Sequence, residues 1–558
     1  MTKRMDRRGF VASSLATAAA TTLGTMATVV PVHAAAALPP RPPEDDTAAP
    51  DVFAYAEVGV AELQSRMTKG TLTSRALTAA YLARIAAVDR AGPTLGSVIE
   101  LNPDALTIAA QRDAERRVGK VRGPLHGIPV LIKDNIDTAD RMQTTAGSLA
   151  MVGQPAPRDA FIVERLRAAG AVLLGKTNLS EWANFRSTRS TSGWSGRGGQ
   201  TRHPYVTDRN PCGSSSGTGS AISANLAAIG IGTETDGSII CPSSICGLVG
   251  LKPTVGLWSR SGIIPISSTQ DTAGPMGRRV ADVAALLGAL TGVDSRDRAT
   301  AASAGKSATD YTTFLDAKAL QGARIGVARN MAGFHPGADA AFERGLEALR
   351  RAGAIIVDPA NVPTVGKYDE AELTVLLYEF KAGVNAYLAE RGGTVSVRTM
   401  DEVIAYNRAH ADTEMPFFGQ EQMERAQTMG SLDEAAYREA LETCRRLSRD
   451  EGLDAILTEH SLDAIVAPSN GPSWPTDLLN GDRYTGGNSS VAAVSGYPSI
   501  TVPMGFVGPL PLGMSFIGRA WSEGRLIGLA YAFEQATTAR RAPQFLATAP
   551  IPAPARGR

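Results

Sequence analysis

The sequence predicts an α/β protein with a central, mostly parallel β-sheet flanked by helices. Segments in which apolar residues recur every three or four positions alternate with short apolar runs, which is typical of helices that connect the strands of one sheet. The 558 residues are 43% hydrophobic and 20% charged, a composition that provides a large core. At about 150 residues per domain, length alone would suggest three or four domains. No internal repeat is visible.

The first 34 residues have the organisation of an export signal. Basic residues precede a mildly apolar run over 9–30, and residues 32–34 offer a small-residue cleavage site. Arg7 and Arg8, followed by Gly-Phe-Val, are similar to the twin-arginine signal, which is an address and not an anchor. The alternatives are an uncleaved membrane anchor or a disordered basic tail, but the run is too rich in threonine to make a convincing span. We therefore expect a periplasmic or secreted protein without a stable membrane anchor.

A proline-rich linker is predicted over residues 35–55, because proline fixes φ and removes a hydrogen-bond donor. Helical periodicity begins near Val58. Further helices are predicted over Ser74–Asp89, Asn102–Arg117, Asp159–Ala169, Asn178–Asn184, Val280–Leu290, Pro336–Arg351, Glu370–Glu390, Asp433–His460 and Gly524–Thr537. Strands are predicted over Ile128–Ile132, Ala171–Leu174, Ala323–Ala328, Asp463–Ala467, Ser499–Pro503 and Gly513–Ile517.

Two loops of small residues stand out in the stretch from residue 210 to 256. The first covers Gly213–Gly217, the second covers Thr233–Ser238, and an apolar segment separates them. Glycine lets the backbone adopt positive φ and approach a ligand closely, while serine supplies hydroxyl groups. Each loop alone could be a turn beside a buried helix. Their combination with Lys133 at the end of a predicted strand and with the run Gly247–Thr254 favours a functional site.

These motifs resemble the amidase signature family of serine hydrolases, in which a GGSSxG loop is followed by a GGSI(R)xP loop. Lys133, within the segment Gly127–Asn135, matches the family's lysine motif. The segments Gly262–Ile266 and Gln270–Met276 resemble the peptide amidase-like branch. The resemblance implies a single amidase signature domain over residues 56–540, with a mixed α/β/α fold and a C-terminal tail over 541–558. The helix-rich segment 368–451 is then expected to build the substrate mouth.

The resemblance also implies the catalytic residues. Ser238 would be the nucleophile, Lys133 the base and Ser214 the serine between them, preceded by a cis peptide bond from Gly213. Backbone N–H groups of Thr235, Asp236, Gly237 and Ser238 would form the oxyanion hole. Lysine can act as a base if burial lowers its pKa, and the apolar residues before Lys133 would desolvate it. A strand-end lysine paired with Asp134 or Asp137 is the alternative that the residues alone leave open.

The second loop departs from the common family pattern. Many members have Gly-Gly-Ser-Ile-Arg or Gly-Gly-Ser-Ile-Gln, whereas this chain has Asp-Gly-Ser-Ile-Ile over residues 236–240. Asp236 weakens the analogy to the tRNA amidotransferase subunits, and an exported protein would have no charged tRNA to modify. The adjacent Ile239 and Ile240 suggest an uncharged pocket wall.

Three other motif matches are weaker. Residues 170–177 fit the P-loop pattern, but the four residues between its glycines read as an apolar strand and leave no phosphate loop. Residues 213–217 fit the G-x-S-x-G elbow, which needs a preceding strand and a downstream histidine base such as His335, His410 or His460. Residues 303–306 match S-x-x-K in an Ala/Ser/Thr connector without its partner motifs.

The cysteine and charge patterns limit which cofactors and partners we expect. Cys212, Cys241, Cys246 and Cys444 could pair in an oxidising compartment, but the apolar surroundings of Cys241 and Cys246 favour free buried thiols. No CxxC knuckle is present, so we expect neither a metal nor a cofactor. The formal net charge is +1 and no basic run follows the N-terminus, which argues against nucleic acid as a partner.

The expected protein is an exported amide hydrolase, a monomer or homodimer, that cleaves a carboxamide through an acyl-enzyme. Peptide C-terminal amides are the first substrate expectation. Aryl acylamides, oligoamides and carbamates remain alternatives, because the fold and the triad do not set acyl specificity. Two other classes stay open, namely a histidine-dependent esterase and an inactive binding protein.

Overall fold

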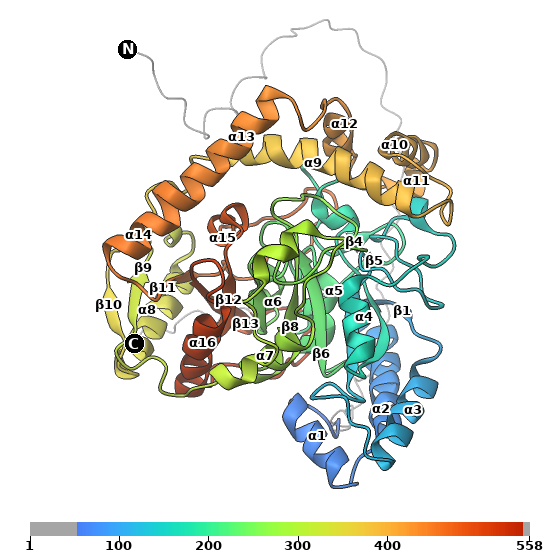
Figure 1. The fold of residues 1–558 in the computed structure, drawn as a ribbon, viewed down its shortest axis with the longest axis horizontal. Helices are drawn as coiled ribbons and strands as arrows, with labels where there is room; N and C mark the ends of the chain where they lie inside the picture. The colour runs from blue at the N-terminus through green and yellow to red at the C-terminus, as the bar shows by residue number, and fades with distance from the viewer. Residues whose placement is uncertain (1–52, 551–558) are drawn as a thin grey trace, which may run out of the picture. The chain divides into compact units, whose positions relative to one another are not determined.

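The structure is a computed structural model that describes residues 53–550 (Figure 1). The predicted export signal over 1–34, the linker up to residue 52 and the end of the tail lie outside the described residues. Phe53 and Tyr55, which close the predicted linker, pack against the core beside Tyr81. Among the described residues, no helix has both the length and the apolar character that crossing a membrane requires.

Within the described residues, eleven strands form one mixed sheet in the order β1-β3-β2-β6-β8-β7-β12-β13-β11-β9-β10. The strands are β1 (Val98–Leu101), β2 (Pro129–Lys133), β3 (Val172–Thr177), β6 (Ile229–Glu234), β7 (Val249–Lys252), β8 (Thr272–Gly277), β9 (Arg324–Val327), β10 (Ile355–Val357), β11 (Ala464–Pro468), β12 (Ser499–Val507) and β13 (Leu510–Ile517). A separate two-stranded sheet joins β4 (Trp194–Ser195) to β5 (Gly199–Gln200).

The α/β class and the central mixed sheet are confirmed, but the expected parallel majority is wrong. Among the described strands of this sheet, four pairings are parallel and six are antiparallel. Antiparallel neighbours can be joined by a tight turn, as β12 and β13 are, whereas parallel ones need a long crossover. Apolar periodicity locates a strand but does not give its direction. The sequence therefore could not show which strand pairings are parallel.

Sixteen α-helices lie in the described part of the chain, beside short 3-10 and π-helical segments. They are α1 (Val60–Thr68), α2 (Ser74–Ile85), α3 (Ala105–Arg117), α4 (Phe161–Ala168), α5 (Ser216–Ser223), α6 (Ile240–Ile245), α7 (Val280–Ala289), α8 (Pro336–Arg351), α9 (Asp369–Glu390), α10 (Met400–Ala409), α11 (Ala411–Glu414), α12 (Glu421–Gln427), α13 (Ala435–Arg445), α14 (Asp454–Glu459), α15 (Ser489–Ser495) and α16 (Glu523–Thr537). The single helix expected over 433–460 is interrupted, because π-helical turns and a non-helical Gly452 separate α13 from α14.

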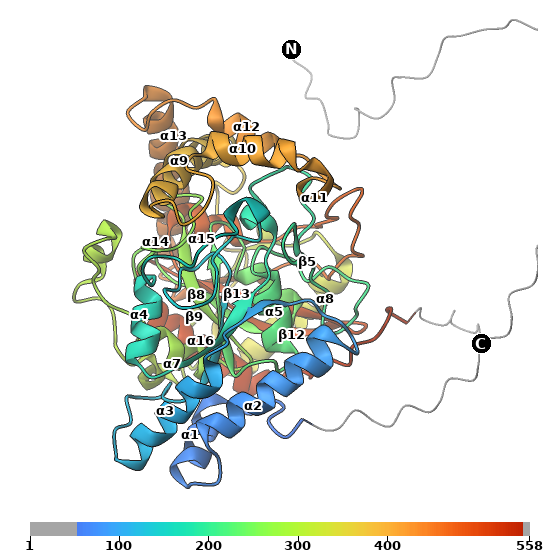
Figure 2. The same cartoon turned by 90° about the vertical axis from the view of Figure 1, so that its right-hand side faces the viewer.

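Helices cover the sheet and also its edge. α16 contacts both α7 and α8, all three contact the sheet, and α5 and α6 pack together against it. Gly230 of β6 and Gly250 of β7 permit this approach, since a Cβ would lie 2.7 Å from Thr218 Cγ2 and 2.1 Å from Ser243 Oγ, respectively. α9 and α13 form an arch along the top of Figure 1, and Figure 2 shows α1–α3 at the opposite end from that arch.

Candidate active site

Lys133 lies at the end of β2, in the parallel part of the sheet, and is completely buried. Its Nζ donates to Ser214 Oγ at 2.7 Å, to Thr233 Oγ1 at 2.8 Å and to Thr233 O at 3.2 Å. Burial lowers the pKa of Lys133 to about 7, while the charges of Asp271 and Glu234 act in the opposite direction. The side chain is therefore near its midpoint of protonation at neutral pH, and its partners are hydroxyl and carbonyl oxygens rather than Asp134 or Asp137.

Ser214 stands at the start of the first small-residue loop, between Lys133 and the second loop. The Gly213–Ser214 peptide bond is cis, as the family resemblance implies, and Ser214 is completely buried. The adjacent Ser215 donates from its N–H to Ser238 O at 3.2 Å and from its Oγ to Thr233 O at 3.0 Å. These bonds fix the two loops against each other and bring Ser238 close to the Lys133–Ser214 pair.

Ser238 is the only one of the three residues that solvent reaches, with 8% of its surface exposed. Residues 235–238 connect β6 to α6, and in the described chain no acceptor is bonded to the four backbone N–H groups of this loop. No hydrogen bond among the described residues joins the Ser238 hydroxyl to Ser214 Oγ. Gly237 and Ser238 are buried while Thr235 and Asp236 are half-buried. Buried N–H groups are normally paired, so free donors beside Ser238 form a place for a developing negative charge.

Two carboxylates that were not predicted as site residues hold this loop. Asp271 accepts from Thr235 Oγ1 at 2.6 Å and from the N–H groups of Ile266 and Ser267, and burial raises its pKa to about 6. Glu234 Oε2 accepts from the N–H groups of Ile239 and Ile240 at 2.7 and 2.9 Å. Asp271 belongs to the quoted motif over residues 270–276, but only the fold brings it to Thr235.

The helix α9 is attached to the segments that carry the site. Glu372 accepts from Gln270 Nε2 at 2.9 Å, and Gln270 also donates to Thr235 O at 3.4 Å. Near the other end of the helix, Tyr387 donates to Asp137 Oδ1 at 2.7 Å, four residues beyond Lys133. The helical segment that was expected at the substrate mouth therefore contacts the loops after β2 and β6.

Two cavities flank the loop that carries Ser238. One, of about 200 Å³, is lined by Thr233, Thr235 and the segment 263–268. The other, of about 290 Å³, is lined by Gly213, Asp236 and Gly237 on one side and by Trp474 and Tyr484 on the other. A substrate in the second cavity would meet Gly213 of the first loop, Asp236 and Gly237 of the second, and Cys212 and Cys241 beside them.

A disulfide joins Cys212 to Cys241, which corrects the expectation of free thiols for this pair. Cys246 and Cys444 are free and buried, as expected for thiols in apolar surroundings. The sequence could not show the pair, because Cys212 and Cys241 are separated by 29 positions and approach only when the two serine loops pack together. The bond lies two residues before Ser214 and three residues after Ser238.

Replacing Cys212 and Cys241 together with serine is expected to lower the free energy of unfolding by about 2–4 kcal/mol, since the closed loop no longer restricts the unfolded chain. Urea unfolding of the mature protein with and without dithiothreitol measures the loss. Reductant should destabilise the wild type and leave the double variant unchanged. Equal effects of reductant on both proteins would contradict the prediction.

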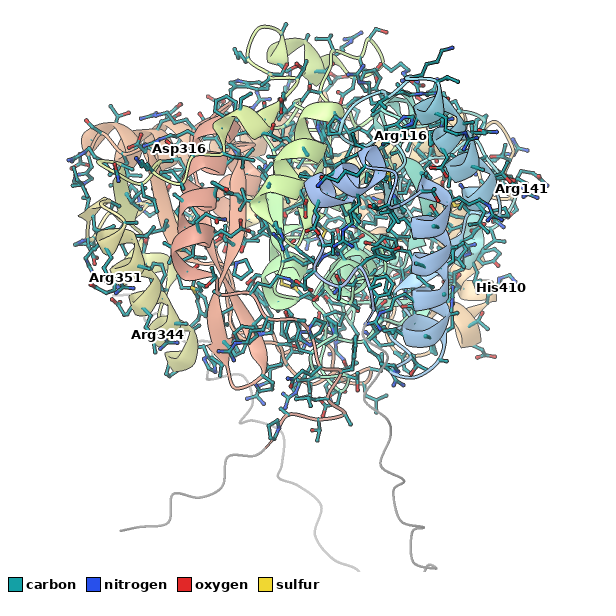
Figure 3. The ribbon with its side chains drawn as sticks, turned by 90° about the horizontal axis from the view of Figure 1, so that it is seen from below. Arg116, Arg141, Asp316, Arg344, Arg351 and His410 are labelled. Atoms are coloured by element: carbon teal, nitrogen blue, oxygen red, sulfur yellow. A yellow bond between two sulfur atoms is a disulfide. The ribbon has the colours of Figure 1, made fainter. Side chains whose placement is uncertain are left out.

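Two of the alternative motifs can be compared with the structure. Lys176 belongs to β3, where its Nζ donates to Ile136 O at 2.6 Å and to Thr144 Oγ1 at 2.9 Å, so residues 170–177 form no phosphate loop. His335 Nδ1 caps α8 by accepting from Gly337 N at 3.0 Å. His410 stacks on Tyr406 and lies at the margin in Figure 3. Within residues 53–550, no histidine is hydrogen-bonded to Ser214 or Ser238.

Comparisons with known proteins show which family this chain is similar to. The Amidase family model matches residues 76–527. A probable amidase of Arabidopsis thaliana is 42% identical over 509 residues, covering 89% of this chain and 93% of the relative. The crystal structure of a peptide amidase with the competitive inhibitor chymostatin is 56% identical, with a TM-score of 0.86, and the match covers 88% of this chain and 99% of that one. The native peptide amidase of Stenotrophomonas maltophilia is 55% identical, with a TM-score of 0.85 and the same coverage.

Proposed function

The chain belongs to the amidase signature family and is an amide hydrolase, and from this premise we propose that Ser238, Ser214 and Lys133 carry out its chemistry. The observation that carries the proposal is the 2.7 Å contact between a fully buried Lys133 Nζ and Ser214 Oγ. When Lys133 is neutral, its two N–H groups can donate to the two oxygens of Thr233, which leaves its lone pair directed at Ser214. Serine is a weak nucleophile until a base takes its proton.

In the proposed reaction, Ser238 Oγ attacks the amide carbonyl carbon. Its proton passes to Ser214, and the proton of Ser214 passes to Lys133 Nζ. The backbone N–H groups of residues 235–238 bind the resulting oxyanion, and a single donor of this kind typically contributes about 3–4 kcal/mol to transition-state stabilisation. The C–N bond then breaks while the proton returns to the leaving nitrogen. Water hydrolyses the acyl-enzyme along the same route and regenerates Ser238.

The pH dependence of the reaction follows from the protonation of Lys133. Only the neutral amine accepts a proton, and the pKa of Lys133 is lowered to about 7. We expect kcat/KM to increase about tenfold per pH unit below that value and to level off above it. Initial rates from pH 5 to 9 on a substrate without titrating groups test this. A rate that is constant from pH 5 to 8 would contradict a lysine base.

Peptide C-terminal amides are the proposed substrates. The support is the 55–56% identity to two peptide amidase structures and the cavities on both sides of the Ser238 loop, which leave space for an extended chain. Aryl acylamides, oligoamides and carbamates are the competing substrates. A panel containing a dipeptide amide, a simple aliphatic amide, an anilide and a carbamate distinguishes them by kcat/KM. The proposal requires the dipeptide amide to rank first, and a higher rank for the anilide or the carbamate would reject it.

Export through the twin-arginine route is the second part of the proposal. It rests on the pattern at Arg7 and Arg8, and the Cys212–Cys241 disulfide supports it because such bonds persist mainly in oxidising compartments. Cell fractionation of the full chain and of the Arg7→Lys/Arg8→Lys variant is the test. The wild type should appear outside the cytoplasm and the variant inside it. The same distribution for both proteins would reject this route.

A further inference from the structure

A cavity outside the serine loops lies between the C-terminal end of α13, the π-helical segment 446–453 and α15. Its volume is about 330 Å³, in the range of small-molecule sites. In the described chain it is lined by two arginines, apolar side chains such as Val375 and Leu441, and aromatic rings, and by no aspartate or glutamate. This charge balance differs from that of the active site, where carboxylates surround the oxyanion loop.

Arg445 and Arg449 supply the positive charge. They are four residues apart on one helical face, a spacing at which like charges repel. Arg449 Nε donates to Ser495 O at 2.7 Å, and neither arginine forms an ion pair within residues 53–550. The neighbouring Arg446, which does not line the cavity, pairs with Glu451 at 2.6 Å. Burial lowers the pKa of Arg449 and the charge of Arg445 lowers it further, while Tyr497, Asp454 and Asp450 act in the opposite direction.

The nearby carboxylates are occupied elsewhere or exposed. Asp454 accepts from Tyr497 OH and from Arg519 NH1, both at 2.7 Å. Glu372 accepts from Gln270, and Glu523 accepts from Thr254 N at 2.7 Å. Asp450 is exposed. Two guanidinium groups therefore face the cavity without a protein anion between them.

Aromatic side chains provide a surface for an apolar ligand body. The Tyr497 ring lies 5.7 Å from the Arg449 guanidinium carbon. Trp521 lines another wall, and Lys306 Nζ lies 5.0 Å from the centre of its ring. A third cation is thus close to the cavity. A ligand that combines an anionic group with a flat apolar body matches both features.

We propose that this cavity binds a small organic carboxylate, with its carboxylate between Arg445 and Arg449 and its apolar part against Trp521. Guanidinium groups pair with carboxylates through two parallel charge-assisted hydrogen bonds. The site is separate from Ser238, because no residue of 233–238 lines it, and it shares only Ser268 with the cavity over 263–268. Amide hydrolysis releases a carboxylic acid, so the ligand class includes the enzyme's own products.

Titration calorimetry of the mature protein with phenylacetate tests the proposal, and 2-phenylethanol is the uncharged control ligand. Arg449→Gln and Arg445→Gln should each weaken phenylacetate binding about tenfold or more, the expected cost of losing a charge-assisted hydrogen bond. Arg438→Gln is the matched control, because Arg438 is an exposed arginine on the same helix that does not line the cavity. It should bind like the wild type.

Arg449→Lys provides a second variant, which keeps the charge but loses the planar fork, and circular dichroism verifies the fold of each protein. Equal affinity of the wild type and the arginine-to-glutamine variants would overturn the proposal. Equal affinity for phenylacetate and 2-phenylethanol would do the same. Because the experiment measures binding and not hydrolysis, its outcome is independent of whether Ser238 is the nucleophile.

Discussion

The Ser238→Ala variant is expected to retain its fold and to lose amide hydrolysis by a factor on the order of 10⁴ or more in kcat, as is typical when a nucleophile that acts in a unit is removed. Ser238 Oγ is the atom that would form the acyl-enzyme, and the free N–H groups of residues 235–238 have no function in catalysis without it. The side chain is small and partly accessible, so its truncation should change the melting temperature little. Initial rates and thermal unfolding are measured on the same preparation.

Ser65→Ala is the matched control for the Ser238 variant. Ser65 lies on an exposed face of α1, so removing its hydroxyl should leave both the rate and the stability unchanged. Incubation with a slowly hydrolysed ester should give a covalent adduct on the wild type that mass spectrometry assigns to Ser238. If the Ser238→Ala variant still hydrolyses its best amide at a tenth of the wild-type rate, Ser238 is not the nucleophile.

The Lys133→Met variant is the second change for which we expect a large effect. Methionine fills a similar volume but accepts no proton, so kcat should fall by about 10²–10⁴, the usual contribution of a general base. The pH dependence with a midpoint near 7 should disappear with it. Rates of the purified variant from pH 5 to 10 measure both effects, because hydroxide-driven reaction would remain at the alkaline end.

Lys176→Met is the matched control for Lys133→Met. Both lysines are completely buried on neighbouring strands, and both donate to a threonine hydroxyl and a backbone carbonyl. Only Lys133 contacts Ser214. Lys176→Met should therefore lower stability, since Asp134 and Asp137 lose a nearby positive charge, but should leave kcat of the folded fraction within a few-fold. A comparable loss of kcat in both variants would point to a general effect of removing a buried charge.

The sequence was most informative where the pattern is local. The helix Pro336–Arg351 was predicted with its observed bounds, because a proline marks its first turn and apolar residues repeat along one face. The strand before Lys133 was found from its apolar run. Strand direction and the break near Gly452 were missed, since both depend on which segments pack together rather than on the periodicity of one segment.

In the candidate site too, residues within local motifs were predicted, whereas contacts that depend on packing were missed. Lys133, Ser214 and Ser238 were identified because each belongs to a motif, and the structure brings their segments together. Thr233 reaches Lys133 through the pairing of β2 with β6, and Asp271 reaches Thr235 through the pairing of β6 with β8, so these contacts have no signal in a single sequence. The disulfide was missed for a related reason, since the apolar surroundings of Cys241 are typical of a buried thiol and also of a buried disulfide.

The Cys212–Cys241 bond has a consequence for local motion around the serines. It closes a covalent ring that contains Ser214, Ser238, α5 and β6. Proteins usually open in parts, and active-site loops tend to belong to the parts that open most easily. Here the two loops are prevented from separating while the rest of the fold stays intact. Amide hydrogens of α5 and β6 should therefore exchange with solvent only in the global unfolding event, and reduction of the ring should allow them to exchange earlier than those of β12 and β13.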